Sequence, residues 1–293
     1  MPPSDMLREV ASQPECWREV GRRRAEVDAL FAESGGRMAL VGCGTSYYVA
    51  AAAARLREDA RLGASDPFPA SEVPFGRHYP WVLAVSRTGT TTEVIRAVES
   101  LAGARRLVIC ADGNSPLAAM ADRLLLLDFA DERSVVQTRF ATTTLVAVRT
   151  YLGEDVDALA GAAEEAISDP LPCDAGEYAR IVFVGRGWCA GLAAEASLKM
   201  TEAAGAMCQW YPAMEVRHGP ISSMDGDTLV WLMGKVDGDL VGAVRSTGAR
   251  LIGGDRDPLV ELVLVQRTAE DLARKRERDP DAPPHLGRSV ILS

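Results

Sequence analysis

Residues 41–53 read VGCGTSYYVAAAA, and this stretch decides the fold because a similar one, VGRGWCAGLAAEA, returns at residues 184–196. The two stretches align without gaps at an offset of 143 positions. In each, an apolar run ends in a glycine turn and an alanine-rich helical pattern follows, which is how a β-α-β unit opens. The sequence therefore predicts two tandem copies of one α/β unit.

The other apolar runs support this prediction, because they alternate little, as parallel strands covered by helices on both faces should. Further strands are predicted at residues 81–85, 107–110 and 124–127 of the first half and at residues 228–233, 249–253 and 260–265 of the second. Helices are predicted at residues 5–35 and around 134–152. The predicted fold is α/β, with two tandem doubly wound, flavodoxin-like parallel sheets in domains 1–165 and 166–293.

Composition excludes several classes of function. The 293 residues are 47% hydrophobic and 25% charged, as in a globular protein, and the net charge of −9 argues against nucleic-acid and anionic-membrane partners. No run of 18 apolar residues occurs, and the start is not typical of a signal peptide, so we expect a cytoplasmic protein. The six cysteines form no CxxC pair; we expect neither metal nor cofactor, and do not favour Cys43 or Cys189 as a nucleophile.

The first candidate catalytic residues lie in the second predicted alanine-rich helix. Glu195, Lys199 and Glu202 follow each other at helical spacing, so their side chains share one helix face. Such a face is most often a solvated salt-bridge ladder. The active-site interpretation is favoured by the preceding glycine turn and by His218 downstream, one of three histidines in the chain.

The segment Ser86–Thr92 offers five hydroxyls, an arginine and a glycine where a predicted strand meets a helix. Amide N–H groups at a helix N-terminus favour an anion, and hydroxyls together with Arg87 add donors. One hydroxyl would suffice to cap the helix, so this segment predicts a phosphate site rather than a simple cap. The Gly42–Ser46 turn is not GxGxxG and lacks a P-loop lysine, so dinucleotide and ATP chemistry are not expected.

Together these segments resemble the sugar isomerase (SIS) family, and within it the isomerase half of glucosamine-6-phosphate synthase and the amino-sugar-phosphate deaminases. The matching segments, in chain order, are MLREVASQP (6–14), GCGTS (42–46), SRTGTTTE (86–93), GRG (185–187), EASLKMTE (195–202) and EVRHGP (215–220). The resemblance implies SIS subdomains and a sugar phosphate as the small-molecule partner. The synthase's glutaminase domain has no counterpart in this sequence, so we do not expect glutamine-derived ammonia within this chain.

The resemblance also implies roles for individual residues. Glu202 would move a proton between C1 and C2, Lys199 would lie near the open-chain sugar, and His218 would help to open the pyranose ring. Because the family's histidine usually comes from the neighbouring subunit, a homodimer with a shared active site is expected. The implied substrate- and phosphate-binding positions are Gly44, Thr45, Ser46, Ser86, Arg87, Thr88, Thr91, Glu195 and Arg288.

Two positions depart from the family pattern. Arg288 stands where the family tail has a lysine that can form a Schiff base, and a guanidinium cannot make that imine. Thr90 stands where glutamate is more frequent. Both departures weigh against ordinary ketose–aldose exchange and leave C2 deprotonation by Glu202 untouched.

Three functions remain open. The first is an isomerase or deaminase acting on glucosamine 6-phosphate or N-acetylglucosamine 6-phosphate. The second is a dehydratase, a lyase that eliminates water from N-acetylglucosamine 6-phosphate through the same carbanion. The third is a non-catalytic phosphosugar sensor, which the presence of Lys199, Glu202 and His218 together argues against.

Overall fold

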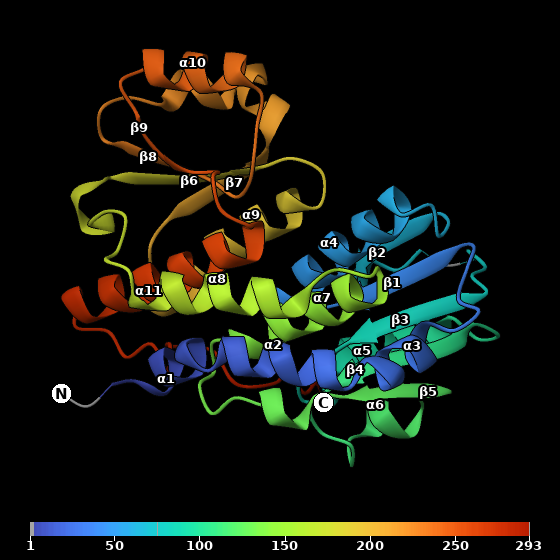
Figure 1. Ribbon diagram of the computed structural model, residues 1–293. Coiled ribbons are helices and arrows are strands. Elements are labelled where there is room, and N and C mark those ends of the chain that lie inside the picture. Colours follow the sequence, from blue (N-terminus) through green and yellow to red (C-terminus); the bar gives the residue numbers. More distant parts are fainter. Residues whose placement is uncertain (1–2, 75, 293) are drawn as a thin grey trace.

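The computed structural model describes residues 3–74 and 76–292 and contains two all-parallel sheets. Their strand orders are β2-β1-β3-β4-β5 and β7-β6-β8-β9 (Figure 1). The strands are β1 Met38–Gly42, β2 Ser65–Pro69, β3 Trp81–Val85, β4 Arg105–Cys110, β5 Arg123–Leu126, β6 Arg180–Gly185, β7 Cys208–Pro212, β8 Thr228–Leu232 and β9 Arg250–Gly253. The first order is that of a doubly wound, flavodoxin-like sheet, so the predicted fold class is confirmed.

Helices surround and join the two sheets. Figure 1 shows α10 on the outer side of the second sheet, with α8, α9 and α11 between this sheet and the N-terminal helices. The helices are α1 Asp5–Ala11, α2 Gln13–Arg22, α3 Arg24–Phe31, α4 Thr45–Asp59, α5 Thr92–Ser100, α6 Pro116–Ala119, α7 Arg139–Tyr151, α8 Val156–Ser168, α9 Cys189–Ala204, α10 Gly238–Ser246 and α11 Pro258–Lys275.

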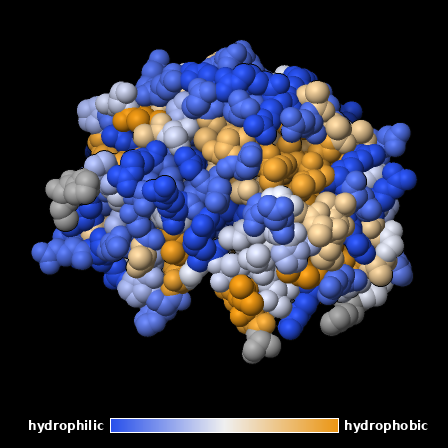
Figure 2. Space-filling model, turned by 90° about the horizontal axis from the view of Figure 1, so that it is seen from below, coloured by the Kyte–Doolittle hydropathy of each residue, from blue (hydrophilic) through white to orange (hydrophobic). Residues whose placement is uncertain are grey.

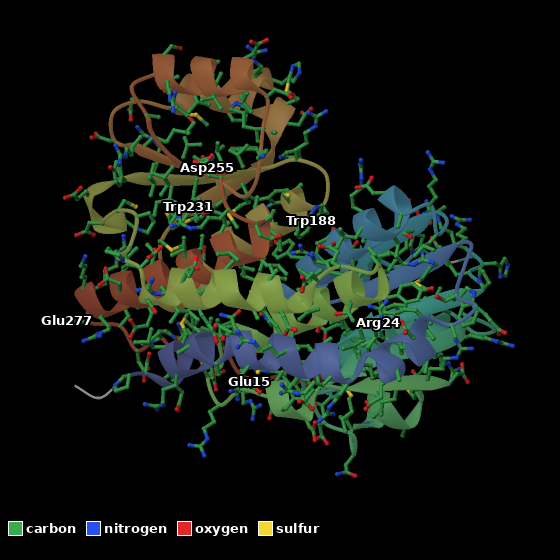
Figure 3. The ribbon with its side chains drawn as sticks, in the orientation of Figure 1. Glu15, Arg24, Trp188, Trp231, Asp255 and Glu277 are labelled. Carbon is green, nitrogen blue, oxygen red and sulfur yellow. The ribbon has the colours of Figure 1, made fainter. Side chains whose placement is uncertain are left out.

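The two halves share one hydrophobic core. A single cluster of buried side chains includes Leu40 and Leu83 of the first sheet and Phe183 and Trp231 of the second. The rings of Phe183 and Trp231 stack with centroids 6.1 Å apart, and Figure 3 shows Trp231 inside the second half. Helices α7, α9 and α11 supply much of the same cluster, so burial of apolar area stabilises both halves together.

Sequence reasoning missed the edge strands β2 and β7. Their sequences, SDPFP and CQWYP, are short and contain proline, which an edge strand tolerates because one side of it needs no ladder hydrogen bonds. They begin at residues 65 and 208, again 143 positions apart, and both run into a Pro-Ala-x-Glu-Val sequence (69–73 and 212–216). The repeat therefore extends beyond the two glycine turns.

Two predicted elements were wrong. Residues 260–265 are not a strand but part of helix α11, which begins at Pro258 and carries Asp257 as its N-cap. The run resembles a buried strand because almost every face of α11 is buried, which removes the helical period from the sequence. The single helix expected at residues 5–35 is instead three helices, with breaks at Ser12 and Arg23.

The repeated glycine turns have a steric cause. A Cβ placed on Gly42 would lie 2.5 Å from the carbonyl carbon of Ser46, and one on Gly185 would overlap the main chain of Cys189. Glycine at both positions thus lets the following helix begin close against its strand. Strand order reverses between β1 and β3, and the turns after these two strands lie at the carboxyl edge of the sheet, where doubly wound proteins bind ligands.

Candidate active site

A buried charge cluster lies on α9 where that helix packs against α4. The Nζ of Lys199 donates to Glu202 Oε2 at 2.5 Å and to Thr45 Oγ1 at 2.8 Å, and lies 3.4 Å from Glu195 Oε1. Thr45 Oγ1 in turn donates to Glu195 Oε1 at 3.3 Å. The stripe read from the sequence is therefore not a solvated salt-bridge ladder. It is a network that faces the first half of the molecule.

Burial differs sharply within this cluster. The side chains of Glu195 and Lys199 are 0% exposed, whereas that of Glu202 is 19% exposed. Burial raises the pKa of Glu195 to about 7, with Lys199 opposing the rise and Glu202 adding to it. Burial lowers the pKa of Lys199, but Glu195 and Glu202 outweigh that effect and hold it above its ordinary value. A fixed ammonium thus lies against one deeply buried carboxylate and one that reaches solvent.

The first half of the chain contributes to this cluster because α4 and α9 approach very closely. Gly191 makes this approach possible, since a Cβ there would lie 2.8 Å from the carbonyl oxygen of Tyr48 and 2.9 Å from the amide nitrogen of Ala52. Thr45, in the first turn of α4, consequently reaches Glu195 and Lys199. Gly44, the residue before α4, has φ 51° and allows the turn that places Thr45 there.

The hydroxyl segment lies beside the glycine turn of β1. Ser46, Ser86, Thr88 and Thr91 all line one small cavity of about 30 Å³. The oxygen of Ser86 accepts the N–H of Gly89, and that of Thr88 accepts the N–H of Thr90. The hydroxyls of Thr88 and Thr90 lie 2.9 Å apart and share one hydrogen bond, whereas within residues 3–74 and 76–292 the hydroxyl hydrogen of Ser86 has no acceptor and can be donated to an anion.

Arg87 departs from the expectation that its guanidinium faces a phosphate. Its side chain is 1% exposed and points inward, where Nη1 donates to the carbonyl of Ser134 at 3.0 Å and lies 3.6 Å from Glu132 Oε2. Nη2 approaches the carbonyls of Val135 and Arg288 at 3.4 Å each. The side chain lines the cavity, but its guanidinium donates hydrogen bonds to neighbouring main-chain carbonyls.

The C-terminal tail crosses the start of α5. The carbonyl of Val290 accepts the N–H of Thr92, and Ser289 Oγ lies 2.9 Å from Thr90 Oγ1. Arg288 donates to Asp131 at 2.7 Å and lines the same small cavity. Arg288 and the unusual Thr90 therefore both help to hold the tail over the hydroxyl segment.

His218 is not brought to the rest of the predicted site within one chain. It ends the 3-10 helix Ala213–His218, which follows the edge strand β7, and its side chain is exposed. In the described ranges no hydrogen bond or ion pair joins it to the charge cluster or to the hydroxyl segment.

Three site neighbours escaped sequence reasoning. Tyr48 follows Thr45 by one turn of α4, and its pKa is raised by burial and by the charges of Glu195, Tyr47 and Glu202. Gln137 lines the small cavity, and its Oε1 is buried without a hydrogen-bond partner among the described residues. Glu132 lies behind Arg87. Glu132 and Gln137 could have been predicted, because they follow β5 at the ligand-binding edge of the sheet.

Two further properties of the described residues bear on the class of protein. Residues 3–74 and 76–292 include no helix with the length and apolar character of a membrane span. Within those ranges no group of three or more histidine, cysteine, aspartate or glutamate side chains is arranged to hold a metal ion. The face of the molecule in Figure 2 is mostly hydrophilic, with apolar patches between.

Comparison with known proteins gives a family match over part of the chain. Residues 30–152 match the SIS domain family. The chain is 26% identical to a glutamine–fructose-6-phosphate aminotransferase (isomerizing) of Streptomyces coelicolor, covering 99% of this chain and 59% of that relative. The chain thus spans about three fifths of the length of that relative.

Solved structures agree. A glucosamine-6-phosphate deaminase of Thermotoga maritima matches with a TM-score of 0.80 and 25% identity over 99% of this chain and 100% of its own. A tagatose-6-phosphate ketose/aldose isomerase of Escherichia coli shares the fold, with a TM-score of 0.80 and 19% identity over 99% and 96% of the two chains. The chain contains a SIS domain and has the two-sheet fold of phosphosugar isomerases, which confirms the resemblance read from its motifs.

Proposed function

We propose that this protein is an enzyme that acts on an amino-sugar 6-phosphate by removing the proton from C2, as an isomerase or deaminase. The observation that carries the proposal is the buried Glu195–Lys199–Glu202 cluster, which Thr45 contacts, and the cavity lined by the next residue, Ser46, and by the hydroxyls of Ser86, Thr88 and Thr91. The similarity to a glucosamine-6-phosphate deaminase over the whole chain supports the same substrate class.

In the proposed reaction the sugar opens to its aldehyde, which makes the C2 proton removable. Glu202, the carboxylate that reaches solvent, takes this proton, and the electrons move toward O1 as an enediol-like or enamine intermediate forms. Return of the proton to C1 gives an imine at C2. Water then hydrolyses the imine to a ketose and ammonia. Lys199 fixes Glu202 and favours negative charge on the developing oxygen.

A dehydratase is the second candidate, and the position of Arg288 favours it over a ketose aminotransferase. Arg288 pairs with Asp131, and no guanidinium forms a Schiff base with a ketose. With an acetylated nitrogen, which leaves less easily, the same C2 carbanion would expel the C3 hydroxyl as water.

The two candidates separate in one assay. Purified protein is incubated with glucosamine 6-phosphate or with N-acetylglucosamine 6-phosphate, and ammonia release and mass loss of water are followed. We expect ammonia from the free amine. Loss of water from the acetylated sugar alone would establish the dehydratase, and no change in either sugar would reject both enzymes.

We expect the phosphate group to bind at Ser86–Thr91. A Ser86→Ala/Thr88→Ala double variant loses two donors to a charged group, each worth about 1.5–3 kcal/mol, so the Kd for inorganic phosphate should rise roughly 100-fold or more. Ser100→Ala, at the other end of α5, removes a hydroxyl that donates to the carbonyl of Ala97, away from the cavity, and serves as the matched control. Equal phosphate affinity of the double variant and the control, measured by titration calorimetry, would contradict the assignment.

We also propose a homodimer that completes the site with His218. The edge strand β7 and its flanks expose Met207 at 93%, Trp210 at 39% and Met214 at 43%, beside the 3-10 helix that carries His218. An edge strand with exposed apolar side chains suits a partner surface. A second copy of this chain is the occupant that would bring His218 to a charge cluster it does not reach within its own chain.

Subunit complementation tests the shared site. His218→Ala and Glu202→Gln chains, each inactive by expectation, are co-expressed with different tags. A mixed dimer holds one intact site of two, and half of all dimers are mixed, so about a quarter of wild-type activity should return. A mixture no more active than either parent, or a fully active monomer in sedimentation, would reject the shared site.

A further inference from the structure

The main chain of residues 132–135 is held from two sides by buried charges. Glu9 Oε1, on α1, accepts the N–H of Arg133 at 2.5 Å and approaches that of Ser134 at 3.5 Å. On the other side, Arg87 donates to the carbonyls of Ser134 and Val135. This segment precedes α7 and lies outside regular secondary structure, so these two side chains, together with the carbonyl of Asp281 that accepts the N–H of Val135, replace the ladder that a strand would provide.

Glu132 connects Arg87 to α7. Its Oε1 accepts the hydroxyl of Thr138 at 2.7 Å and the N–H of Arg139 at 2.9 Å, at the first residues of that helix. Its Oε2 faces Arg87 Nη1 at 3.6 Å. The two side chains are 1% exposed or less, and the ion pair joins the hydroxyl segment to the start of α7.

The ion pair is poorly explained by stability alone. Glu132 Oε2 and Arg87 Nε have no hydrogen-bond partner among the described residues. Removing two charges from water costs several kcal/mol per ion, and an imperfectly satisfied pair recovers this poorly. Its effect is therefore better sought in the geometry that it imposes.

The geometry that the Arg87–Glu132 pair imposes affects the walls of the small cavity. The segment fixed by the pair continues to Gln137, which lines the cavity with Ser86 and Thr88. Arg87 also approaches the carbonyl of Arg288, so the tail is tied to the same point. The charge of Glu132 is close enough to raise the pKa of Lys199, although burial and the two carboxylates on α9 act on it more strongly.

We propose that Arg87 is a positioning residue that, with Glu132, holds segment 132–137 and the C-terminal tail against the hydroxyl segment. The pair thereby sets the walls of the small cavity at which the phosphate group of the substrate binds. The kinetic part of this inference rests on the proposed function; the structural part does not.

The test is Arg87→Lys, which keeps the charge and cannot reach the carbonyls of Ser134, Val135 and Arg288 together. Arg57→Lys is the matched control, because Arg57 is also buried and donates to the main-chain carbonyls of Ser34 and Leu62, away from the cavity. Hydrogen–deuterium exchange of the ligand-free protein reports on residues 131–138 and 286–292. Loss of charged hydrogen bonds should speed exchange there roughly 10- to 100-fold in Arg87→Lys and leave it unchanged in Arg57→Lys.

Kinetics supply the second readout. Misplaced walls should raise KM for the sugar phosphate by roughly the same factor with a smaller fall in kcat, whereas Arg57→Lys should lower the melting temperature only. If Arg87→Lys does not fold, Glu132→Gln is measured in its place, because it keeps the side-chain shape and removes the ionic partner. Unchanged exchange at residues 131–138 overturns the positioning role. Faster exchange in a protein whose wild type turns over no sugar phosphate upholds that role and rejects the proposed function instead.

Discussion

Glu202→Gln will slow exchange of the substrate's C2 hydrogen with deuterated water at least 100-fold, roughly the lower limit for loss of a general base, while leaving substrate affinity nearly intact. The amide keeps the shape of the side chain and removes the base, and losing a general base costs about 100- to 10,000-fold in rate. Following exchange by NMR isolates deprotonation from the product that forms afterwards, so the result holds for the isomerase, deaminase and dehydratase candidates alike.

The matched control for this experiment is Glu164→Gln. Glu164 also pairs with a cation, Arg18, but the pair is exposed at the surface, so its loss should not affect exchange. If Glu202→Gln exchanged at the wild-type rate, the base would have to be sought at Glu195. If the wild type exchanged no amino-sugar phosphate, the phosphosugar sensor would become the better description.

Lys199→Met will lower both activity and stability, and the loss of stability will grow with pH. The substitution removes the cation from between Glu195 and Glu202 and leaves Glu195 buried with Thr45 as its remaining polar contact. Breaking a buried pair in this way costs about 3–5 kcal/mol when the remaining charge stays ionised. Glu195 can avoid part of that cost by binding a proton.

The direction in which stability changes with pH follows from the pKa of Glu195. It is about 7 in the folded protein against 4.5 for the unperturbed group, so the folded state binds more protons between these values. The contribution of Glu195 to stability is therefore most favourable below pH 4.5 and is lost as pH rises through 7. Without Lys199 the folded pKa rises further, because Lys199 lowers it in the wild type. The destabilisation should thus be smaller at pH 6 than at pH 9.

Urea unfolding at the two pH values measures this difference. The other buried carboxylates with raised pKa, such as Glu9, act equally in wild type and variant and cancel in the comparison. Lys275→Met is the control, because Lys275 pairs with Asp174 and Asp271 in solvent, where such pairs contribute little, and its loss should change stability equally at both pH values. A pH-independent loss in Lys199→Met would show that Glu195 does not take up the proton.

The sequence predicted the fold well because the repeat combines local steric and periodic signals. Gly42 and Gly185 are required because the next helix lies in close contact with them, and these glycines can be recognised in the sequence. The strands β2 and β7 were missed because an edge strand needs neither an apolar run nor freedom from proline. Helix α11 was partly misread because complete burial removes the periodicity on which its assignment depends.

The candidate site was predictable where a side chain acts through its own helix or turn. The spacing of Glu195, Lys199 and Glu202 placed them on one face of α9, and the structure adds that this face is buried against Thr45. The direction of Arg87 was not predictable, because it depends on Glu132 and Ser134, more than 40 positions later in the chain. The same holds for Gln137, which reaches the cavity only through the path of the segment before it.

The contact between Thr45 and Lys199 joins two halves whose corresponding residues are not equivalent. The α4 residues that lie 143 positions before Glu195, Lys199 and Glu202 are Ala52, Leu56 and Asp59. The first half carries the hydroxyls of the site, whereas Lys199 and both of its carboxylate partners lie in the second half. Neither half holds the complete set, so separating the two halves would dismantle the composite centre that they build together.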